Sequence, residues 1–495
     1  MSKYLISILL SIAVSISYGF SNENSYEKYY MGLPFETQIP TLPSFGELSI
    51  SITEFGAVGD GHSLNTQAFQ NTIKYVASKG GGKVIVPRGI WLTGPIELQS
   101  NINLHLEEGA LIVMSPNLEL YKVVYKEGTS GMAYHIQSPI SAQNCENIAI
   151  TGNGIIDGSG DLWRYRKKGK FTELEWKGII QSGGVTTSKG DRWYPTKEAM
   201  DYAIDQIQIT DSATAVKYRS GLTPKLLSFV DCKKVLLKGI TFQNPPNWNV
   251  HPLGCEDVII DNIIIRSAWS AQNSDALDIE SCNRVLIINS SFDVGDDAIC
   301  IKSGKNLAGR KRGKPSQNII IDNCVVYHGH GGFVIGSEMS GGVKNISVRN
   351  CTFIGTDVGL RFKSTRGRGG IVSNIFMDQI QMINIVKNAI IFELYYGNAD
   401  KNAPIPAVSE ETPQFKDMHF KNIVCNNSEH ALYVVGLPEM NVRNITFDSM
   451  KITSKKGILI NWAKDFVFKN CQFTTTEVQD TEAIKLFETS NINFQ

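Results

Sequence analysis

The second half of the chain repeats a short pattern of apolar and polar positions. Each copy has one polar residue, then four or five residues in which β-branched and other apolar side chains alternate, then an Asn or Gly turn. Runs of this kind predict short strands. The polar residue before each strand falls at positions 257, 284, 318, 345, 374, 417, 444 and 465, so the spacings are 27, 34, 27, 29, 43, 27 and 21 residues. An earlier copy begins at Asn147.

A period in the twenties, with several strands and no helix in each repeat, predicts the coils of a parallel β-helix. A leucine-rich repeat fits less well because Leu is not the recurring residue, and a sandwich would not keep this register. Neighbouring coils of a β-helix lie about 4.8 Å apart. Equivalent positions in successive repeats should therefore be close in space, although many residues separate them along the chain.

The N-terminal part of the chain has a different pattern. Residues 65–78 predict an amphipathic helix with Phe69, Ile73 and Val76 on its apolar face, and three glycines at 80–82 end it. Residues 83–87 predict a strand. We expect the region 50–90 to cap the open N-terminal end of the solenoid, whose unpaired strand edges need cover.

An insertion at residues 157–226 interrupts the repeat. It is rich in basic and aromatic residues, which are Trp163, Arg164, Tyr165, Arg166, Lys167, Lys168, Lys170, Trp176, Trp193 and Tyr194. Such residues can stack on sugar rings and pair with carboxylates. The alternative is a solvated loop with a small core of its own.

The first 19 residues predict a secretory signal. Lys3 is followed by an apolar run over residues 5–16 and by the small-x-small sequence Ser17-Tyr18-Gly19. The apolar run is too short to span a membrane, and no later segment resembles a membrane span; the alternative is a buried N-terminal helix. We therefore expect an exported protein, periplasmic or secreted, whose residues 20–495 form one β-helix domain.

Charge and cysteine content exclude some classes of protein. The formal net charge is zero, whereas a nucleic-acid-binding domain is strongly basic. The nine cysteines lack the spacing of a disulfide scaffold or a zinc site. Most of them lie in or beside the repeated strands, so we expect small buried core residues, with one or two disulfides possible in an oxidising compartment.

Four short motifs follow one another at intervals close to one repeat. They are Asn273-Ser274-Asp275, Gly295-Asp296-Asp297, Gly329-His330-Gly331 and Arg361-Phe362-Lys363. Hydrolysis of a glycoside needs one protonated and one ionised carboxyl group, and crowding of acids raises the pKa of one of them. Asp296 and Asp297 would point to opposite faces of a regular strand, so we expect a bend at Gly295.

The other two motifs supply a histidine and two cations. His330, between two glycines that leave room for a ligand, can orient an acid or tune its pKa, although a buried core histidine is the alternative. Arg361 and Lys363 share one face of a strand. Two neighbouring cations are costly unless an anion lies between them, and a sugar carboxylate would serve; the alternative is a solvated basic edge.

In this order the four motifs resemble the patterns Asn-x-Asp, Asp-Asp, Gly-His-Gly and Arg-x-Lys of the polygalacturonases, glycoside hydrolase family 28, over about residues 50–490. The resemblance implies an all-β, right-handed parallel β-helix that hydrolyses α-1,4-linked galacturonic acid with inversion and without metal or cofactor. It assigns the general acid to Asp296, activation of water to Asp275 and Asp297, and support of the acid to His330.

The resemblance also implies substrate-binding residues. Arg361 and Lys363 would hold a uronate carboxylate, Asn273 would line the cleft, and Tyr396 resembles a substrate-stacking tyrosine; Lys302 is a further candidate. The chain departs from the family in having Gly295 where Gln is common and Phe362 where Ile is common.

The long insertion resembles additions of the bacterial exo-acting branch. An insertion that closes one end of a groove favours release of terminal residues, so we expect exo action from the non-reducing end of pectin or polygalacturonate by a monomer. Endo action remains open. Three rivals are a rhamnogalacturonan hydrolase or another pectin-directed galacturonidase of the same fold, a β-helix pectin lyase with a calcium site or arginine base, and a polysaccharide-binding solenoid.

Overall fold

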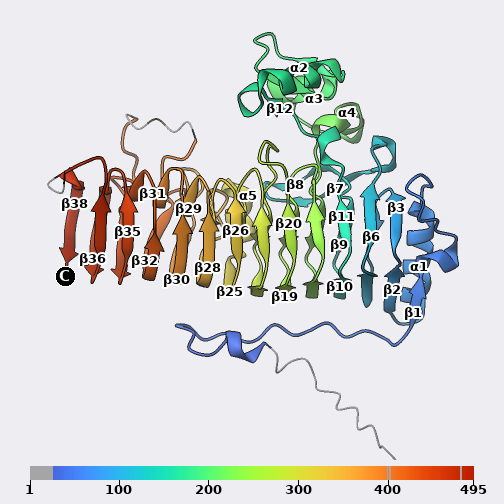
Figure 1. Ribbon diagram of the computed structural model, residues 1–495, viewed down its shortest axis with the longest axis horizontal. Coiled ribbons are helices and arrows are strands. Elements are labelled where there is room, and N and C mark those ends of the chain that lie inside the picture. Colours follow the sequence, from blue (N-terminus) through green and yellow to red (C-terminus); the bar gives the residue numbers. More distant parts are fainter. Residues whose placement is uncertain (1–25, 398–399, 401–402, 480–481) are drawn as a thin grey trace, which may run out of the picture.

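The expected parallel β-helix is present. In this computed structural model residues 26–397, 400, 403–479 and 482–495 are described, so the predicted signal at residues 1–19 lies outside the described residues. Parallel strands join in one sheet of 33 strands, and Figure 1 shows them as a row of stacked coils.

Most coils contribute three strands, one to each face of the solenoid. The first face contains β10 (Glu146–Gly152), β16 (Lys233–Lys238), β19 (Glu256–Asp261), β22 (Asn283–Ile288), β25 (Ser316–Asp322), β28 (Val343–Ile354), β30 (Ile371–Ile383), β32 (Gln414–Cys425), β34 (Val442–Asp448), β36 (Ile458–Lys469) and β38 (Ile484–Phe494). The second contains β11 (Ile155–Asp157), β17 (Thr241–Gln243), β20 (Ile264–Arg266), β23 (Ser291–Asp293) and β26 (Val325–His328). The third contains β15 (Leu227–Val230), β18 (Val250–Leu253), β21 (Leu277–Glu280), β24 (Ile299–Lys302), β27 (Phe333–Ile335), β29 (Val358–Lys363), β31 (Asn388–Glu393) and β33 (His430–Val435).

The register of the first face follows the repeat seen in the sequence. Val258 pairs with Val285, and Val285 pairs with Ile319. All eight polar residues that precede the repeated strands have φ between 55° and 58°. Asn and Asp tolerate this left-handed conformation better than most residues, which explains why they recur at this position.

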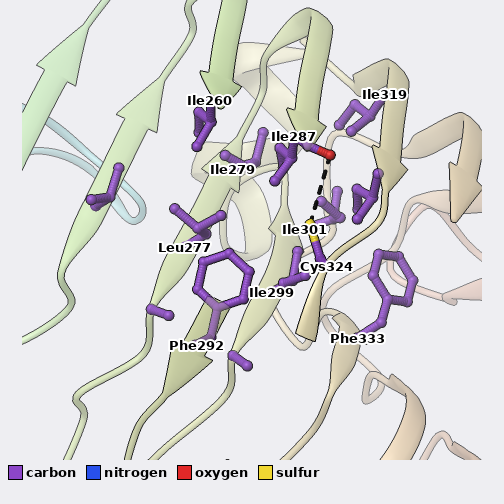
Figure 2. Packing of buried hydrophobic residues seen from close by; sticks show 14 of the residues in the cluster. Ile260, Leu277, Ile279, Ile287, Phe292, Ile299, Ile301, Ile319, Cys324 and Phe333 are labelled. Atoms are coloured by element: carbon purple, nitrogen blue, oxygen red, sulfur yellow. Dashed lines mark hydrogen bonds between the residues drawn. The ribbon is translucent and has the colours of Figure 1, made fainter. Parts of the chain in front are cut away.

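The core is a stack of inward side chains from successive coils. Leu277 pairs with Ile299, and Ile299 with Phe333, and all three are fully buried. Figure 2 shows this column beside Ile279 and Ile301. A fully buried side chain of this size contributes about 1.5–3 kcal/mol, and the stacking extends one core along the whole solenoid.

The cysteines belong to this core, as predicted. All nine lie in the described part of the chain and are free, and seven of them are buried. The thiol of Cys255 donates to the carbonyl of Phe229 at 3.4 Å, and that of Cys324 donates to the carbonyl of Ile287 at 3.8 Å (Figure 2).

Helix α1 (Thr66–Ser78) covers the N-terminal end of the solenoid, which confirms the predicted cap (Figure 1). Phe69, Ile73 and Val76 are buried, and the helix packs against β1 (Ser49–Ser51) and β2 (Gly82–Val86).

The segment that contains Tyr26 and Tyr29 forms an extended arm along the outside of the first face (Figure 1). The sequence did not predict this arm. Tyr26 and Tyr29 are buried there against outward apolar residues such as Ile259 and Leu286. The hydroxyl of Tyr26 donates to Oδ2 of Asp261 at 3.1 Å.

The insertion at 157–226 stands above the solenoid (Figure 1). It contains β12 (Arg166–Lys167), α2 (Glu173–Gln181), β13 (Val185–Thr186), β14 (Arg192–Tyr194), α3 (Lys197–Ile204) and α4 (Ser212–Lys217). Trp176 and Trp193 form a small core with Ile179, and Trp163 packs against Tyr121. These tryptophans therefore stabilise the insertion, and the expectation that they present stacking surfaces to sugars is wrong.

None of the helices in the described part of the chain has the length and apolarity needed to cross a membrane.

Candidate active site

The third face of the solenoid brings the predicted motifs together. Asp275 precedes β21 by two residues, and Asp297 precedes β24 by two residues. Because Leu277 pairs with Ile299, the two aspartates occupy equivalent positions in neighbouring coils. One carboxyl oxygen each from Asp275, Asp296 and Asp297 lies within 4.8 Å of the other two. The predicted convergence by stacking is confirmed.

The bend predicted at Gly295 is present. Residues 294–298 lie between β23 and β24 outside any strand, which allows Asp296 and Asp297 to act on the same side. A Cβ at Gly295 would lie 2.5 Å from the carbonyl oxygen of Ala271. The close packing of this turn leaves no space for a side chain at this position.

Asp297 is bound by both cations of the fourth motif. Arg361 Nη1 lies 3.1 Å from Oδ1, and Lys363 Nζ lies 2.6 Å from Oδ2. Burial opposes ionisation of Asp297, but the charges of Lys363 and Arg361 outweigh it and hold the pKa below its ordinary value. The anion between the two cations is thus the protein's own carboxylate, whereas we expected a sugar carboxylate. Phe362, between them, points into the core and stacks on Phe392.

Asp296 is the most accessible of the three acids, with 19% of its side chain exposed against 1% for Asp297. His330 Nδ1 lies 3.0 Å from its Oδ1, and the backbone N–H of His330 donates to its carbonyl at 2.8 Å. Burial alone would raise the pKa of Asp296, but the contact with His330 is the main opposing effect and the pKa falls below its ordinary value. The predicted support by His330 is therefore seen in the geometry.

The glycines beside His330 serve close packing. A Cβ at Gly329 would lie 2.9 Å from the carbonyl oxygen of Asp296, and one at Gly331 would lie 2.4 Å from the side chain of Val334. Their small size lets the coils approach, and Gly329 and His330 also line a pocket, so the expectation that the glycines leave room for a ligand stays a prediction.

Of the three aspartates, Asp275 is the one whose carboxyl group keeps a proton most readily. It is buried, and its Oδ1 has no hydrogen-bond partner in the described part of the chain. Burial first, and then the neighbouring charge of Asp296, raise its pKa well above the ordinary value. The crowding argument thus applies to Asp275 in the unliganded site, and not to Asp296.

Next to the acids, on the outer side of the third face, lies a buried ion network that the sequence did not indicate in full. Lys302 is 3% exposed; its Nζ lies 3.1 Å from Glu338 and 3.5 Å from Asp278. Burial raises the pKa of Asp278 to about 7 despite the nearby charge of Lys302. Lys302, predicted to bind substrate, is paired with these two acids beside the site, and its role in binding substrate stays a prediction. Asp278 was missed, although its place three residues after Asp275 was a usable signal.

Aromatic rings border the acids on two sides. Lys363 Nζ and Arg361 lie 4.8 Å and 5.6 Å from the ring centre of Tyr396, which places this predicted residue at the site. On the other side, Trp248 occupies the position of Asp275 one coil earlier, because Val250 pairs with Leu277. Trp248 was not predicted. Asn273 is exposed in a left-handed turn just before Asp275.

A pocket of about 570 Å³ is lined by Gly295, next to Asp296 in the chain, and by His330, Asp357, Trp269 and Lys170. Lys170 comes from the insertion, and its Nζ lies 3.3 Å from the carbonyl oxygen of Trp269. The insertion therefore reaches the cleft through a lysine, as its predicted location near the cleft requires.

The three acids resemble a cation site by distance alone. Both oxygens of Asp297 are already bound by protein cations, however, which makes this carboxylate a poor ligand for a metal ion. The arrangement suits acid–base work on a sugar, where a protonated and an ionised carboxyl group lie close together.

Comparison with known proteins agrees with the site. The family model described as "Glycosyl hydrolases family 28" matches residues 206–492. The exo-poly-alpha-D-galacturonosidase of Dickeya chrysanthemi is 30% identical over 443 residues, which cover 86% of this chain and 71% of that protein. The structure of a hyperthermoactive exopolygalacturonase from Thermotoga maritima superimposes with a TM-score of 0.77 and 31% identity, covering 92% of this chain and 96% of that one.

A polygalacturonase structure from Erwinia carotovora ssp. carotovora shares the fold, with a TM-score of 0.59, 20% identity, and coverage of 93% of this chain and 99% of that one. The family match covers more than half of the chain, and the solenoid, the three acids and the His330 contact agree with it. This chain therefore belongs to glycosyl hydrolases family 28, the polygalacturonase family, and is a glycoside hydrolase.

Proposed function

We propose that this enzyme hydrolyses α-1,4-linked galacturonic acid in polygalacturonate, releasing residues from the non-reducing end with inversion at the anomeric carbon. The observation that carries the proposal is the cluster of three carboxyl groups within 4.8 Å beside Arg361 and Lys363. Acids supply the proton transfer, and the cations suit an acidic sugar. The names of the exo-acting relatives support the same substrate and mode.

Asp296 is our choice for the general acid because its side chain is the most exposed of the three acids and His330 contacts it. Asp275 and Asp297 would hold the attacking water. In the unliganded site the proton favours Asp275, which lies close enough to Asp296 for one water to connect them. Substrate that covers Asp296 removes water from it and raises its pKa, so binding itself would move the shared proton toward the acid.

Arg361 and Lys363 would bind a substrate carboxylate while they remain in contact with Asp297. Arg361 keeps donors that its single contact with Asp297 does not use. The exposed part of Tyr396 lies against both cations and would pack on the same sugar ring.

The stereochemical outcome rests on the family resemblance rather than on the carboxyl spacing. The nearest oxygens lie within 4.8 Å, which is shorter than the roughly 6.5–9.5 Å between carboxyl groups of typical inverting enzymes. Proton NMR of the first-formed anomer decides the point: β-galacturonate supports inversion, and α-galacturonate from the α-linked substrate refutes it.

The activity is tested with polygalacturonate and with the Asp296→Asn variant. We expect galacturonate monomer as the first product, and a rate about 10²–10⁴-fold lower in the variant. Asp448→Asn, a half-exposed carboxyl on β34, outside the site, is the matched control and should keep the wild-type rate. A ladder of oligomers would refute exo action, and near-normal turnover by Asp296→Asn would refute the assignment of the acid.

The same assay separates the rival functions. Unsaturated products that absorb ultraviolet light would indicate a lyase. Cleavage of rhamnogalacturonan in preference to polygalacturonate would indicate the rhamnogalacturonan hydrolase, and no new reducing ends from any pectic polymer would indicate a binding solenoid.

We also propose that the enzyme acts outside the cytoplasm as a monomer. The predicted signal at residues 1–19 supports export. N-terminal sequencing of the exported protein should begin at Phe20, and size-exclusion chromatography with light scattering should give the monomer mass.

A further inference from the structure

A second pocket, of about 310 Å³, lies on the N-terminal side of the acids over the same face of the solenoid. Its floor includes Ser228 of β15 and His251 of β18. Its walls come from two additions to the repeat. One is the hairpin of β7 (Val123–Gly128) and β8 (Gly131–Ile136), and the other is residues 221–225 of the insertion.

The hairpin is held firmly to the solenoid at its tip. The hydroxyl of Thr129 donates to Oε2 of Glu280 at 2.7 Å, and the carbonyl of Thr129 accepts from the N–H of Lys305 at 2.9 Å. Arg312 binds Glu127 at 2.6 Å and Glu280 at 2.8 Å. A polymer cannot pass beneath this hairpin without breaking a buried network, so the groove ends at the pocket.

Trp248 connects this pocket to the acids. Lys225, which lines the pocket, has its Nζ 4.9 Å from the ring centre of Trp248, and Lys302, next to the acids, has its Nζ 4.8 Å from the same ring. Trp248 and Asp275 hold equivalent positions in adjacent coils. The pocket is therefore about one coil away from the catalytic acids, a distance suited to adjacent sugar subsites.

The pocket contains two lysines that form no ion pair. Lys126 donates to the hydroxyl of Ser228 at 3.1 Å, and no carboxylate lies within 4.0 Å of Lys126 or Lys225 among the described residues. Glu280 and Asp278 act on Lys225 only from a longer distance, and Glu280 is itself bound by His251 and Arg312. The acid in the wall, Glu127, is bound by Arg312. Nε2 of His135, which also lines the pocket, is buried and has no hydrogen-bond partner in the described chain.

Unpaired charge in a cavity is unfavourable until an anion enters. Burial and the neighbouring charge of Lys225 lower the pKa of Lys126 to about 8, and burial lowers that of His135 to about 3. Two ammonium groups and a neutral imidazole that needs a partner match a carboxylate next to hydroxyl groups, which is the chemistry of a uronic acid.

We propose that this pocket is the chain-end recognition site, in which Lys126 and Lys225 bind the carboxylate of the uronate at the non-reducing terminus. The inference rests on the proposed function and adds the residues that make the enzyme select an end. Trp248 would pack against this same terminal sugar on the side nearer to Asp275, so that the bond cleaved is the one after the terminal residue, and the hairpin would exclude any residue beyond the terminus.

The test is calorimetric binding of galacturonate and of galactose to proteins carrying Asp296→Asn, which separates binding from hydrolysis. We expect Lys126→Met and Lys225→Met each to weaken galacturonate binding at least tenfold and to leave galactose binding unchanged. Lys122→Met is the matched control, because this exposed lysine lies on the same side of the molecule outside the pocket, and it should bind like the parent. Parent-like galacturonate binding by both pocket variants would overturn the proposal.

Stability and kinetics complete the test. Lys126→Met loses only the contact with the Ser228 hydroxyl and no ion pair, so it should change the melting temperature little, whereas a loss as large as that for a broken buried ion pair would contradict the unpaired state. In the active enzyme each pocket variant should raise KM for digalacturonate at least tenfold and leave kcat within about threefold.

If the wild type does not hydrolyse polygalacturonate, the proposed function fails while the binding experiment still decides the pocket. If hydrolysis is normal and the variants bind like the parent, only the pocket proposal fails.

Discussion

Replacement of Lys363 by Met tests how the site keeps Asp297 ionised. Both partners are almost fully buried, with 6% of the Lys363 side chain and 1% of the Asp297 side chain exposed, and Nζ lies 2.6 Å from Oδ2. Met keeps most of the volume of the Lys363 stem and removes the charge. The perturbation therefore leaves the packing close to native and leaves a buried carboxylate with one cation, Arg361.

The expected loss of stability is large. Removal of one partner from a buried ion pair costs about 3–5 kcal/mol. Because Arg361 still contacts Oδ1 at 3.1 Å, we expect the lower end, about 3 kcal/mol at pH 7.

The loss should depend on pH with a definite sign. In the wild type the pKa of Asp297 is lowered, so its contribution is present above its unfolded pKa of about 3.9 and disappears as pH falls through the folded pKa. In the variant burial outweighs the remaining cation and raises the pKa. Asp297 then protonates under mildly acidic conditions, and each pH unit between the two folded pKa values removes at most about 1.4 kcal/mol of the difference.

Urea unfolding followed by tryptophan fluorescence at pH 7 and pH 4 measures the effect. The variant should be less destabilised at pH 4 than at pH 7 by at least about 1 kcal/mol. Lys456→Met is the control, because Lys456 Nζ lies 2.5 Å from Glu429 at the exposed surface, and it should hardly move the midpoint. The double variant Lys363→Met/Asp297→Asn should recover part of the loss, since it removes the uncompensated charge. Equal destabilisation at both pH values would refute this electrostatic account.

Three further outcomes are expected. Gly295→Gln, the residue common in the family, should lower the melting temperature and abolish activity, because its Cβ would lie 2.5 Å from the carbonyl oxygen of Ala271; native melting and kcat would contradict this packing. Asp275→Asn should raise the melting temperature at pH 7 and leave it unchanged near pH 3. The folded pKa of Asp275 is raised, so this acid costs stability only as pH rises above its unfolded pKa; calorimetry at both values checks the sign. A thiol reagent should label at most Cys145 and Cys471 before unfolding and all nine cysteines afterwards, and early labelling of the buried seven would contradict their burial.

The repeat could be predicted because turn chemistry is local. The left-handed turn before each strand selects residues such as Asn318 and Asn345, and the apolar alternation that follows marks the strand. Once the coils are known to stack in parallel, the spacing also predicts that Asp275 and Asp297 meet. The capping helix was equally visible, since its apolar stripe depends on helical periodicity alone.

The electrostatics of the site could not be predicted in the same way. Arg361 and Lys363 reach Asp297 across an intervening coil, and no local pattern indicates a partner at that distance. The raised pKa belongs to Asp275 because it is the acid that burial isolates from a hydrogen-bond partner. Lys302 is chemically able to bind a sugar, and only the tertiary structure shows its burial against Glu338 beside the site.

The insertion, too, could be predicted only in part from the sequence. Its composition indicated a basic and aromatic segment near the cleft, but the same tryptophans can face a sugar or a core. Trp176 and Trp193 are needed to bury a core in a segment that has no repeat to stack on, which leaves Lys170 to face the cleft. The sequence by itself thus determined the solenoid, its cap and the meeting of the motifs, because these follow from period and turn conformation. Only the tertiary structure decided which charges pair, which acid keeps its proton and where the groove closes, because those depend on burial by segments distant in the chain.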